Sequence, residues 1–273
     1  AVARGEPALS PARSGYYDCG SMRTLTAWVP VGFPDVQPGD DISSIVLDMF
    51  RFNDVAPEDH DVLIIAQKVV SKAEGSVVNL REITPTPEAK QLAAKAEKDP
   101  RLAQVILDEA RAILRVRPGL IIAEHKLGFV CANAGVDHSN VGLGEDWVTV
   151  LPKNPDGFAE TVRSKMEETF GVRVGVVIND THGRPFREGA IGVAIGVAGM
   201  EPLFSYIGQP DLYGYILRAS IEGVADELAS TASLLQGQGA EGTPMVLIRG
   251  GRFKPGIGSL VELLREPKKD MFR

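Results

Sequence analysis

Two acidic residues of the sequence follow apolar runs and lie close to hydroxyl, amide and basic side chains. The first is Asp180, which follows the run 174–178 and precedes Thr181, with Arg184 and Arg187 a few residues further on. Carboxylate and hydroxyl oxygens are ligands for Mg²⁺ or Mn²⁺, and the forked guanidinium group of arginine matches phosphate or carboxylate. The pattern indicates a site for a metal ion and an anion. A tight turn with surface ion pairs is the simpler alternative.

The second acidic residue is Asp137, which lies in the stretch GFVCANAGVDHSNV at residues 128–141. Asn133, Ser139 and Asn140 surround it with short oxygen-bearing side chains on a backbone of small residues. A divalent cation linked to phosphate requires side chains of this kind. An Asx turn, in which the carboxylate of Asp137 only bonds the following backbone, is the alternative.

Lys68 and Lys72 lie four residues apart, directly after the apolar run 62–66. If the chain turns from a strand into a helix here, both ammonium groups lie on one helix face near its N-terminus. Positive charge at that end opposes the helix dipole, and a bound anion would remove the conflict. A solvated helix face with Glu74 as the partner is the alternative.

A further stretch, LLQGQGAEGTP at residues 234–244, combines three glycines with the side-chain oxygens of Gln238 and Glu241. It predicts either a flexible turn that contacts a nucleotide or a metal, or a plain loop between a helix and a strand. Taken together, two carboxylates and several cations predict a divalent metal that bridges a polyphosphate. Phosphoryl transfer depends on such charge neutralisation and positioning.

Short apolar runs bounded by Gly, Pro or charged residues predict the elements that would hold these side chains. The runs that predict buried strands are 62–66, 120–123, 128–131, 174–178, 190–197 and 245–248. The predicted helices are 41–50, one that begins at Pro87 after Thr86, 101–114, one between Asp156 and Gly171, and a long one from about 211 to 236. Their irregular alternation favours an α+β fold with mixed sheets and flanking helices over a doubly wound fold.

Composition and motifs exclude several classes of protein. The 273 residues carry a net charge of −7, which argues against nucleic-acid binding, and no run is apolar enough for a membrane helix. Cys19 and Cys131 indicate reduced thiols in a cytoplasmic protein rather than a disulfide framework. The Walker A, dinucleotide-binding and nucleophile-elbow motifs are absent. We expect residues 1–21 to form a flexible extension and residues 22–273 a single domain of two intimate lobes.

Five segments together resemble the coenzyme F420-0:L-glutamate ligase family, the gamma-glutamyl ligases of deazaflavin coenzyme biosynthesis. The segments are VVSKAEG, VCANAGVDHSNV, NDTHGRPFREGAIGVAIGVAG, DLYG and VADELASTASLLQGQ, and they occur in the family's order. The resemblance implies a mixed α+β fold, a homodimer and a GTP-dependent ligase. This ligase would join L-glutamate to F420-0 by an amide bond through an acyl phosphate, and would then add gamma-linked glutamates.

The resemblance also implies the roles of individual residues. Two divalent cations, Mg²⁺ or Mn²⁺, serve the family's reaction, and K⁺ is a further candidate ion. Asp137 and Asp180 match ligands of one metal, while Thr181 and Gln238 match ligands of the second. Relatives can have glutamate in place of Gln238, and an amide is the weaker cation ligand. Lys72 and Arg187 are the candidates for holding the transferred phosphoryl group.

The same resemblance implies a set of contacts to GTP. The residues concerned are Phe33, Pro34, Asp35, Val36, Gln67, Lys68, Lys72, Asn140, Gln236, Gly237, Gln238, Gly239, Ala240, Glu241, Gly242 and Thr243. His138 and His182 remain as candidates for the base that deprotonates the amine. Three alternatives stay open: a ligase of the same family that acts on another carboxylate cofactor, a metal-dependent nucleotide phosphohydrolase, and a catalytically silent nucleotide-binding protein.

Overall fold

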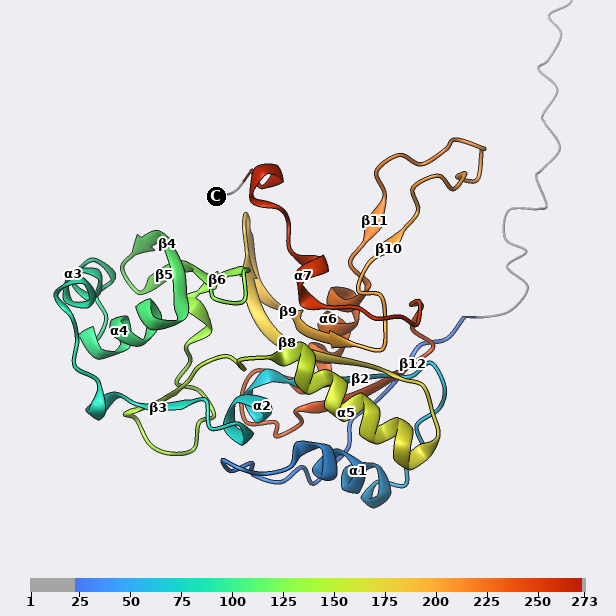
Figure 1. Ribbon diagram of the computed structural model, residues 1–273, viewed down its shortest axis with the longest axis horizontal. Helices are drawn as coiled ribbons and strands as arrows, with labels where there is room; N and C mark the ends of the chain where they lie inside the picture. The colour runs from blue at the N-terminus through green and yellow to red at the C-terminus, as the bar shows by residue number, and fades with distance from the viewer. Residues whose placement is uncertain (1–22, 272–273) are drawn as a thin grey trace, which may run out of the picture.

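The computed structural model describes residues 23–271 (Figure 1). The predicted extension 1–21, with Cys19, therefore lies outside the described residues. The described chain forms a larger body around a five-stranded sheet and a smaller lobe on a three-stranded sheet. None of the helices in the described range is both long and apolar enough to span a bilayer.

The five-stranded sheet is mixed, as the sequence predicted. In spatial order its strands are β1 (Thr26–Trp28), β12 (Met245–Arg249), β2 (Val62–Ala66), β8 (Gly175–Arg184) and β9 (Arg187–Ala198). Only β2 and β8 pair in parallel, and the other neighbours are antiparallel. Helices and short sheets surround this sheet, so the fold class is α+β.

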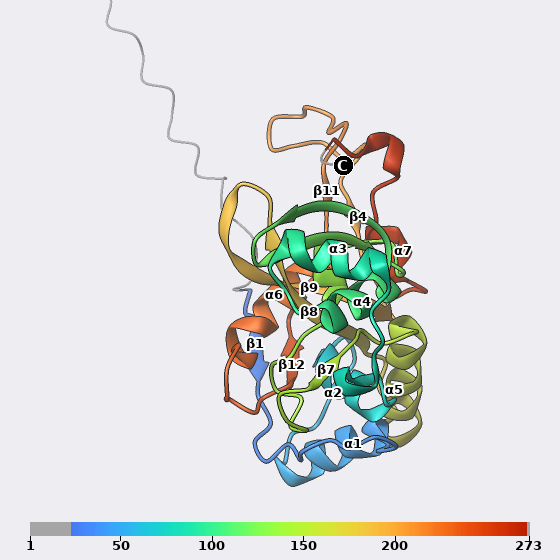
Figure 2. The same ribbon diagram turned by 90° about the vertical axis from the view of Figure 1, so that its left-hand side faces the viewer.

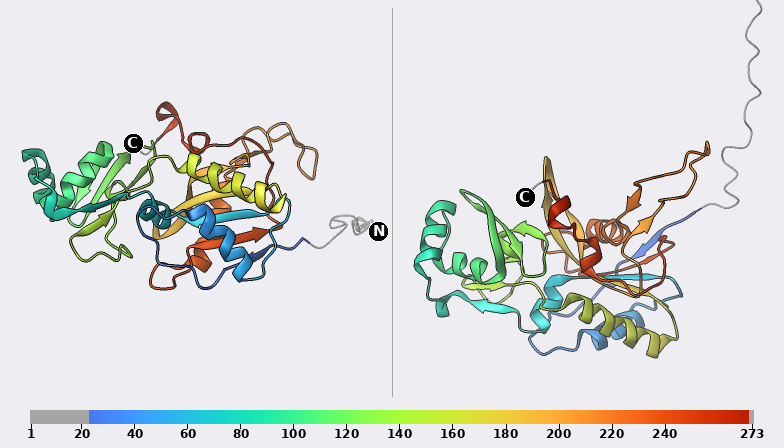
Figure 3. Two further views of the ribbon diagram at one scale, coloured as in Figure 1. Left: turned by 60° about the horizontal axis from the view of Figure 1, so that its bottom comes forward. Right: turned by 45° about the horizontal axis from the view of Figure 1, so that its top comes forward.

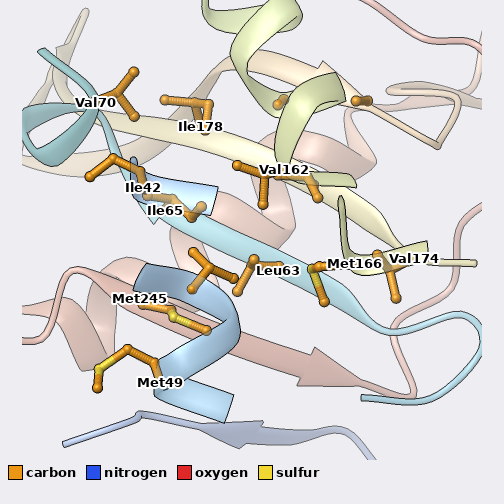
Figure 4. Packing of buried hydrophobic residues seen from close by; sticks show 14 of the residues in the cluster. Ile42, Met49, Leu63, Ile65, Val70, Val162, Met166, Val174, Ile178 and Met245 are labelled. Atoms are coloured by element: carbon orange, nitrogen blue, oxygen red, sulfur yellow. The ribbon is translucent and has the colours of Figure 1, made fainter. Parts of the chain in front are cut away.

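Helices cover both faces of the sheet, which explains why its central strands are continuous apolar runs. Leu63 and Ile65 of β2 pack toward α1 (Ile42–Phe52) and α5 (Pro155–Phe170) (Figure 4). Val62 and Ile64 point the other way, into a second cluster that contains α6 (Val224–Gln236). Alternate residues of one strand thereby stabilise two separate helix layers.

The helix boundaries follow local signals in the sequence. The side chain of Asp41 accepts hydrogen bonds from two backbone N–H groups at the start of α1. Asn154 caps α5 in the same way, and Gly171 ends it in the left-handed conformation that glycine adopts readily. Thr86 caps α3 (Pro87–Ala96), as the sequence predicted.

The smaller lobe has a hydrophobic core of its own. Helix α3 and helix α4 (Pro100–Glu109) pack against a sheet of β4 (Ala110–Arg117), β5 (Leu120–His125) and β6 (Val130–Ala132) (Figure 2). The chain enters and leaves this lobe through an antiparallel ribbon of β3 (Val77–Asn79) and β7 (Trp147–Thr149). The loop between β6 and β7 therefore joins the lobe to the larger body.

The remaining elements are short. Helix α2 (Gln67–Ala73) follows β2 without a break, and α7 (Leu260–Leu263) lies near the end of the described chain. Strands β10 (Phe204–Ser205) and β11 (Ile221–Glu222) pair in a hairpin that projects from the larger body (Figure 3).

Two predicted helices are wrong in their extent. The helix predicted at 101–114 ends at Glu109, and the chain continues as β4, which pairs with β5. The long helix predicted from about 211 begins only at Val224. The side chain of Asp211 accepts hydrogen bonds from the N–H groups of Tyr213 (2.8 Å) and Tyr215 (2.9 Å), which stabilises a turn in place of a helix.

Candidate active site

A cavity of about 570 Å³ lies at the end of β2, where β8 continues beyond it. This volume lies within the range typical of small-molecule sites. Several segments that are distant in sequence line it. The lining residues are Phe33, Pro34, Asp35, Val36, Ala66, Gln67, Lys68, Val69, Lys72, Asp137, Ser139, Asn140, Gly142, Asn179, Asp180, Thr181 and the segment 236–244.

The cavity brings together every residue that the family resemblance proposed for metal or GTP binding, whereas Asn133 lies outside it. Both carboxylates, Asp137 and Asp180, face the same cavity, although one belongs to the loop after β6 and the other to β8. Their common location is what a shared cation requires. The roles of these residues remain predictions, because the structure shows only where they lie.

Arg187, which was predicted to hold the phosphoryl group with Lys72, does not line the cavity. Other candidates outside it are Arg184, His138 and His182. The sequence suggested that the strand ends at residue 178, but β8 continues to Arg184 and pairs with β9 in a hairpin. Arg187 pairs with Arg184 at the turn of this hairpin and is exposed. Its guanidinium group therefore lies at the far end of the β8–β9 hairpin, away from the other residues proposed to contact phosphate.

Lys68 and Asp137 form an ion pair across the cavity wall. The ammonium group of Lys68 donates to a carboxylate oxygen of Asp137 and to the backbone oxygen of Ser139 (2.6 Å). Asp137 also accepts from the N–H of Ser139 (2.9 Å), so the Asx turn proposed as an alternative is present as well. Burial raises the pKa of Asp137, but the hydrogen bonds from Lys68 and Ser139 outweigh it and leave the pKa below its ordinary value.

Lys72 is buried and pairs with Asp35, a lining residue from a segment distant in sequence (2.6 Å). Its hydrogen bond and positive charge lower the pKa of Asp35. The predicted alternative, a solvated helix face with Glu74 as the partner, is wrong. Glu74 instead accepts hydrogen bonds from Ser76 and from the backbone of Lys153.

Asp180 reaches the cavity because β8 extends beyond the end of β2, its parallel neighbour. Strand β2 ends at Ala66, opposite Asn179, so the next residue of β8 has no partner on that side. A register shift follows Ile178, where the pairing with β9 skips Ile195. Bulges of this kind often redirect side chains beside functional sites.

Two neighbours of Asp180 lie on the side toward the small lobe. The Nε2 atom of His182 is 3.0 Å from a carboxylate oxygen of Asp180. Cys131 of β6 lies close enough for the charge of Asp180 to act on it. Burial first, and then this negative charge, raise the pKa of Cys131 to about 12. The thiol is therefore protonated and inert at neutral pH.

The segment after α6 closes the remaining wall. Gly237 ends the helix with a positive φ, and the side chain of Thr243 donates to the backbone oxygen of Gln236 (3.1 Å). The hydroxyl of Thr181 donates to the side-chain oxygen of Gln238 (3.2 Å). Asn140 donates to the backbone oxygen of Gly239 (2.9 Å), which joins two rims of the cavity.

The sequence did not single out Asn179 as a site residue. This buried amide exchanges hydrogen bonds of 2.7 Å and 3.2 Å with Gln236, which also donates to the backbone oxygen of Pro244. The pair connects β8 to the loop after α6. Its position directly before Asp180 was the available signal, because a polar residue at the end of an apolar strand needs a partner.

The donor set of the cavity fits Mg²⁺ or Mn²⁺. Asp137, Asp180, Thr181 and Gln238 offer only oxygen, which hard cations prefer. Across residues 23–271, no three His, Cys, Asp or Glu side chains are grouped so that they hold a metal by themselves. Two carboxylates suit a cation that takes its other ligands from phosphate and water.

Comparison with known proteins gives the family. The model of the F420-0:gamma-glutamyl ligase family matches residues 30–250. The chain belongs to this family. The match includes every segment that lines the cavity. Because the family consists of ligases, this chain is an enzyme of the ligase class.

Individual relatives agree with the family match over most of their length. The coenzyme F420:L-glutamate ligase of Methanothermobacter thermautotrophicus is 46% identical over 245 residues, covering 89% of this chain and 96% of the relative. The protein of the same name from Methanocaldococcus jannaschii is 48% identical over 216 residues, covering 79% and 86%. That from Archaeoglobus fulgidus is 41% identical over 242 residues, covering 89% and 94%.

Proposed function

We propose that this F420-0:gamma-glutamyl ligase family member joins L-glutamate to coenzyme F420-0 by an amide bond, with GTP as the energy source, and then adds gamma-linked glutamates. The observation that carries the proposal is the meeting of Asp137, Asp180, Lys68 and Lys72 at one cavity. Two lysines and two acids that line one cavity suit a triphosphate and its cations. The family match supports the choice of substrates.

The chemistry begins with activation of a carboxylate. An oxygen of the F420-0 carboxylate attacks the γ-phosphorus of GTP, the bond between that phosphorus and the β–γ bridging oxygen breaks, and GDP leaves. The glutamate amine then attacks the carbonyl carbon of the acyl phosphate. Phosphate leaves with the bonding electrons, and the amine loses a proton as the amide forms. Direct coupling would require oxide as the leaving group, which explains the need for GTP.

The lysines hold the triphosphate in this scheme. Lys68 and Lys72 occupy adjacent turns of α2, and their side chains are only 17% and 11% exposed. Each lysine is paired with a carboxylate in the structure, so its side chain is already oriented toward the cavity before the nucleotide binds. Lys72 is the residue that we assign to the transferred phosphoryl group. Arg187 was also predicted for this role, but it is exposed at the hairpin turn and does not line the cavity.

Divalent cations would be held by Asp137 and Asp180 at one position and by Thr181 and Gln238 at the other. When bound, Mg²⁺ or Mn²⁺ would neutralise the negative charge of the β- and γ-phosphates. K⁺ remains a further candidate. The chain itself contributes carboxylates that are already gathered at one cavity, which reduces the cost of assembling the site.

The loops around the cavity keep water from the acyl phosphate. The Asn140–Gly239 hydrogen bond joins the loop after β6 to the loop after α6 (2.9 Å). Both loops contain glycines with positive φ, at positions 142, 237 and 242. We infer that they close over the bound nucleotide, because exclusion of water protects a hydrolysable intermediate.

The test is a product assay with purified protein, GTP, Mn²⁺, F420-0 and L-glutamate. We expect GDP release that requires both acceptor substrates, and a ladder of glutamate additions by mass spectrometry. GDP release without either acceptor would indicate a phosphohydrolase instead. Products that form only with another carboxylate or amino acid would indicate a ligase of different specificity.

The assembly state is a separate part of the proposal. We propose a homodimer, as the family resemblance implies. Light scattering of the purified protein should give twice the mass of the 29.3 kDa chain. A mass equal to that of one chain at all concentrations tested would contradict the dimer and would leave the proposed chemistry unaffected.

A further inference from the structure

His182 contacts Asp180 from outside the cavity. Asp180 lines the cavity, whereas His182 is not among its lining residues. The two residues are two apart on β8 and so point to the same side of the strand. Their side chains are 17% and 13% exposed, and the Nε2 atom of His182 lies 3.0 Å from the Oδ2 atom of Asp180. An ionised carboxylate only accepts hydrogen bonds, so Nε2 is the donor.

The small lobe holds the His182 ring in place. The ring of Phe129 lies 5.2 Å from that of His182, centroid to centroid, at 44° between the planes. Phe129 in turn stacks on His125 of β5, with 5.5 Å between centroids and 16° between planes. His125 is buried and its Nδ1 atom accepts the N–H of Leu127 (3.0 Å). A row of three rings therefore runs from the core of the small lobe to the carboxylate of Asp180.

The geometry points to His182 as a positioning residue that fixes the carboxylate of Asp180 for cation binding, with Phe129 as its brace. This inference rests on the proposed function, in which Asp180 is a cation ligand. The terminal torsion of an aspartate is broad, so a carboxylate without a partner samples many orientations. The hydrogen bond from His182 selects one of them and leaves the other oxygen, Oδ1, for the cation.

This role differs from that of a base for the glutamate amine. The Nε2 atom of His182 is already committed to Asp180, and the ring is covered by Phe129. His182 thus acts through Asp180, without touching the substrates. Loss of comparable hydrogen-bond partners of metal ligands lowers metal affinity by roughly 10- to 100-fold. We expect a loss of that order when the donor is removed.

The test measures Mn²⁺ binding directly, by the electron paramagnetic resonance signal of free Mn²⁺, with GDP present at saturation. His182→Leu removes the donor and should weaken Mn²⁺ binding by about 10- to 100-fold. His182→Gln places an amide nitrogen near the position of Nε2 and should restore affinity close to that of the unaltered protein. Phe129→Ala leaves both partners of the hydrogen bond in place and should produce a smaller loss.

The kinetic readout should agree with the binding readout. His182→Leu should require more Mn²⁺ for half-maximal turnover, and saturating Mn²⁺ should recover most of kcat. A purely structural role would instead lower the melting temperature and the yield of active protein, with the Mn²⁺ requirement unchanged. His60→Asn serves as the control for Mn²⁺ affinity, because His60 is exposed and does not line the cavity.

Asp180→Asn separates failure of this inference from failure of the proposed function. If Asp180→Asn binds Mn²⁺ as tightly as the unaltered protein, the cation assignment is wrong and the role of His182 falls with it. If Asp180→Asn loses affinity while His182→Leu keeps it, only the inference about His182 is overturned. An equal loss in His182→Leu and His182→Gln would also overturn it, because the donor atom would then be irrelevant.

Discussion

At the scale of single residues, the cavity is organised by paired charges. Lys68 bonds to Asp137 and Lys72 bonds to Asp35. A buried ammonium group without a partner is costly, so these carboxylates stabilise the lysines. In the proposed function, nucleotide binding would replace the carboxylate partner of each lysine by a phosphate of GTP, so few additional unpaired charges would be buried.

Lys72→Ala should raise the KM for GTP. The change removes a charge-assisted contact to phosphate, which is worth about 1.5–3 kcal/mol or roughly 10- to 100-fold in affinity. The measurement is the initial rate of GDP release as a function of GTP at saturating F420-0 and glutamate. Lys153→Ala is the matched control, since Lys153 is exposed and does not line the cavity. An unaltered KM in Lys72→Ala would contradict a phosphate contact.

Asp180→Asn should abolish most turnover while the fold survives. The substitution keeps the shape of the side chain but removes the charge that we assign to cation binding, and we expect a loss of at least about two orders of magnitude in kcat. Calorimetry should show a melting temperature close to that of the unaltered protein. Asp48→Asn is the control, because its side chain is 71% exposed on α1. Near-normal kcat for Asp180→Asn would refute the cation assignment.

At the scale of elements, glycines on β9 let two helices approach the sheet closely. A Cβ atom at Gly192 would lie 2.4 Å from the backbone oxygen of Ala229 in α6. At Gly196 it would lie 2.6 Å from the backbone carbon of Pro155, the first residue of α5. These two glycines thus serve packing in the larger body.

Gly196→Ala should destabilise the protein by about 1–3 kcal/mol, the usual cost of overpacking a rigid contact. The added methyl group meets backbone atoms of Pro155, which cannot move without shifting α5. Urea unfolding measures the change. Gly183→Ala on the adjacent strand is the control, since a Cβ there has no atom within 4 Å. Equal stability of both variants would show that α5 adjusts freely.

The sequence predicted the bounds of some helices and strands better than those of others. The run 62–66 was predicted with its correct bounds because β-branched residues, buried on both faces, end at a polar segment. The start predicted at about 211 for the long helix was wrong, because the side chain of Asp211 stabilises a turn there and the helix begins at Val224. Local patterns therefore predict an element well where no side chain competes for its backbone.

The site shows the same division between local and distant signals. Asp137 and Asp180 were predicted to lie at one site because each follows an apolar run and has oxygen-bearing neighbours in the sequence. The contact of Lys72 with Asp35 and that of Asn179 with Gln236 join residues far apart in the chain, and no spacing rule predicts such pairs. Arg187 was misplaced relative to the cavity because the continuation of β8 into a hairpin depends on pairing with β9.

At the scale of the whole molecule, the cavity receives side chains from two bodies with separate cores. Asp137 lies on the loop that leaves the small lobe, whereas Asp180 and the lysines belong to the larger body. The rings of Phe129 and His182 form a second contact between the bodies. The spacing of the two carboxylates therefore depends on how the lobes pack.

Glu109 should contribute to the acid sensitivity of the small lobe. The close contact of the His125 Nε2 atom with a carboxylate oxygen (3.5 Å) chiefly, and the hydrogen bond and charge of Lys126 (3.2 Å), lower the pKa of Glu109 despite partial burial. A depressed pKa in the folded state stabilises the fold above the unfolded value, and this contribution is lost as the pH falls through the folded pKa.

Urea unfolding at about pH 7 and about pH 3 tests this linkage. Glu109→Gln should lose less stability over that interval than the unaltered protein, because it has no carboxylate to protonate. Glu145→Gln, at an exposed position in the loop before β7, is the comparison variant, and its dependence should remain close to that of the unaltered protein. An identical dependence in Glu109→Gln would contradict the role of the His125 contact.

The strand order of the central sheet has a consequence for synthesis on the ribosome. Strand β2 at residues 62–66 lies between β12 at 245–249 and β8 at 175–184. Neither β8 nor β12 has been synthesised when β2 leaves the exit tunnel, and among the described strands β1 also pairs only with β12. Contacts that span so much of the chain slow folding. The nascent polypeptide therefore carries an unpaired, strongly apolar strand through most of translation, and we expect chaperones to bind it there.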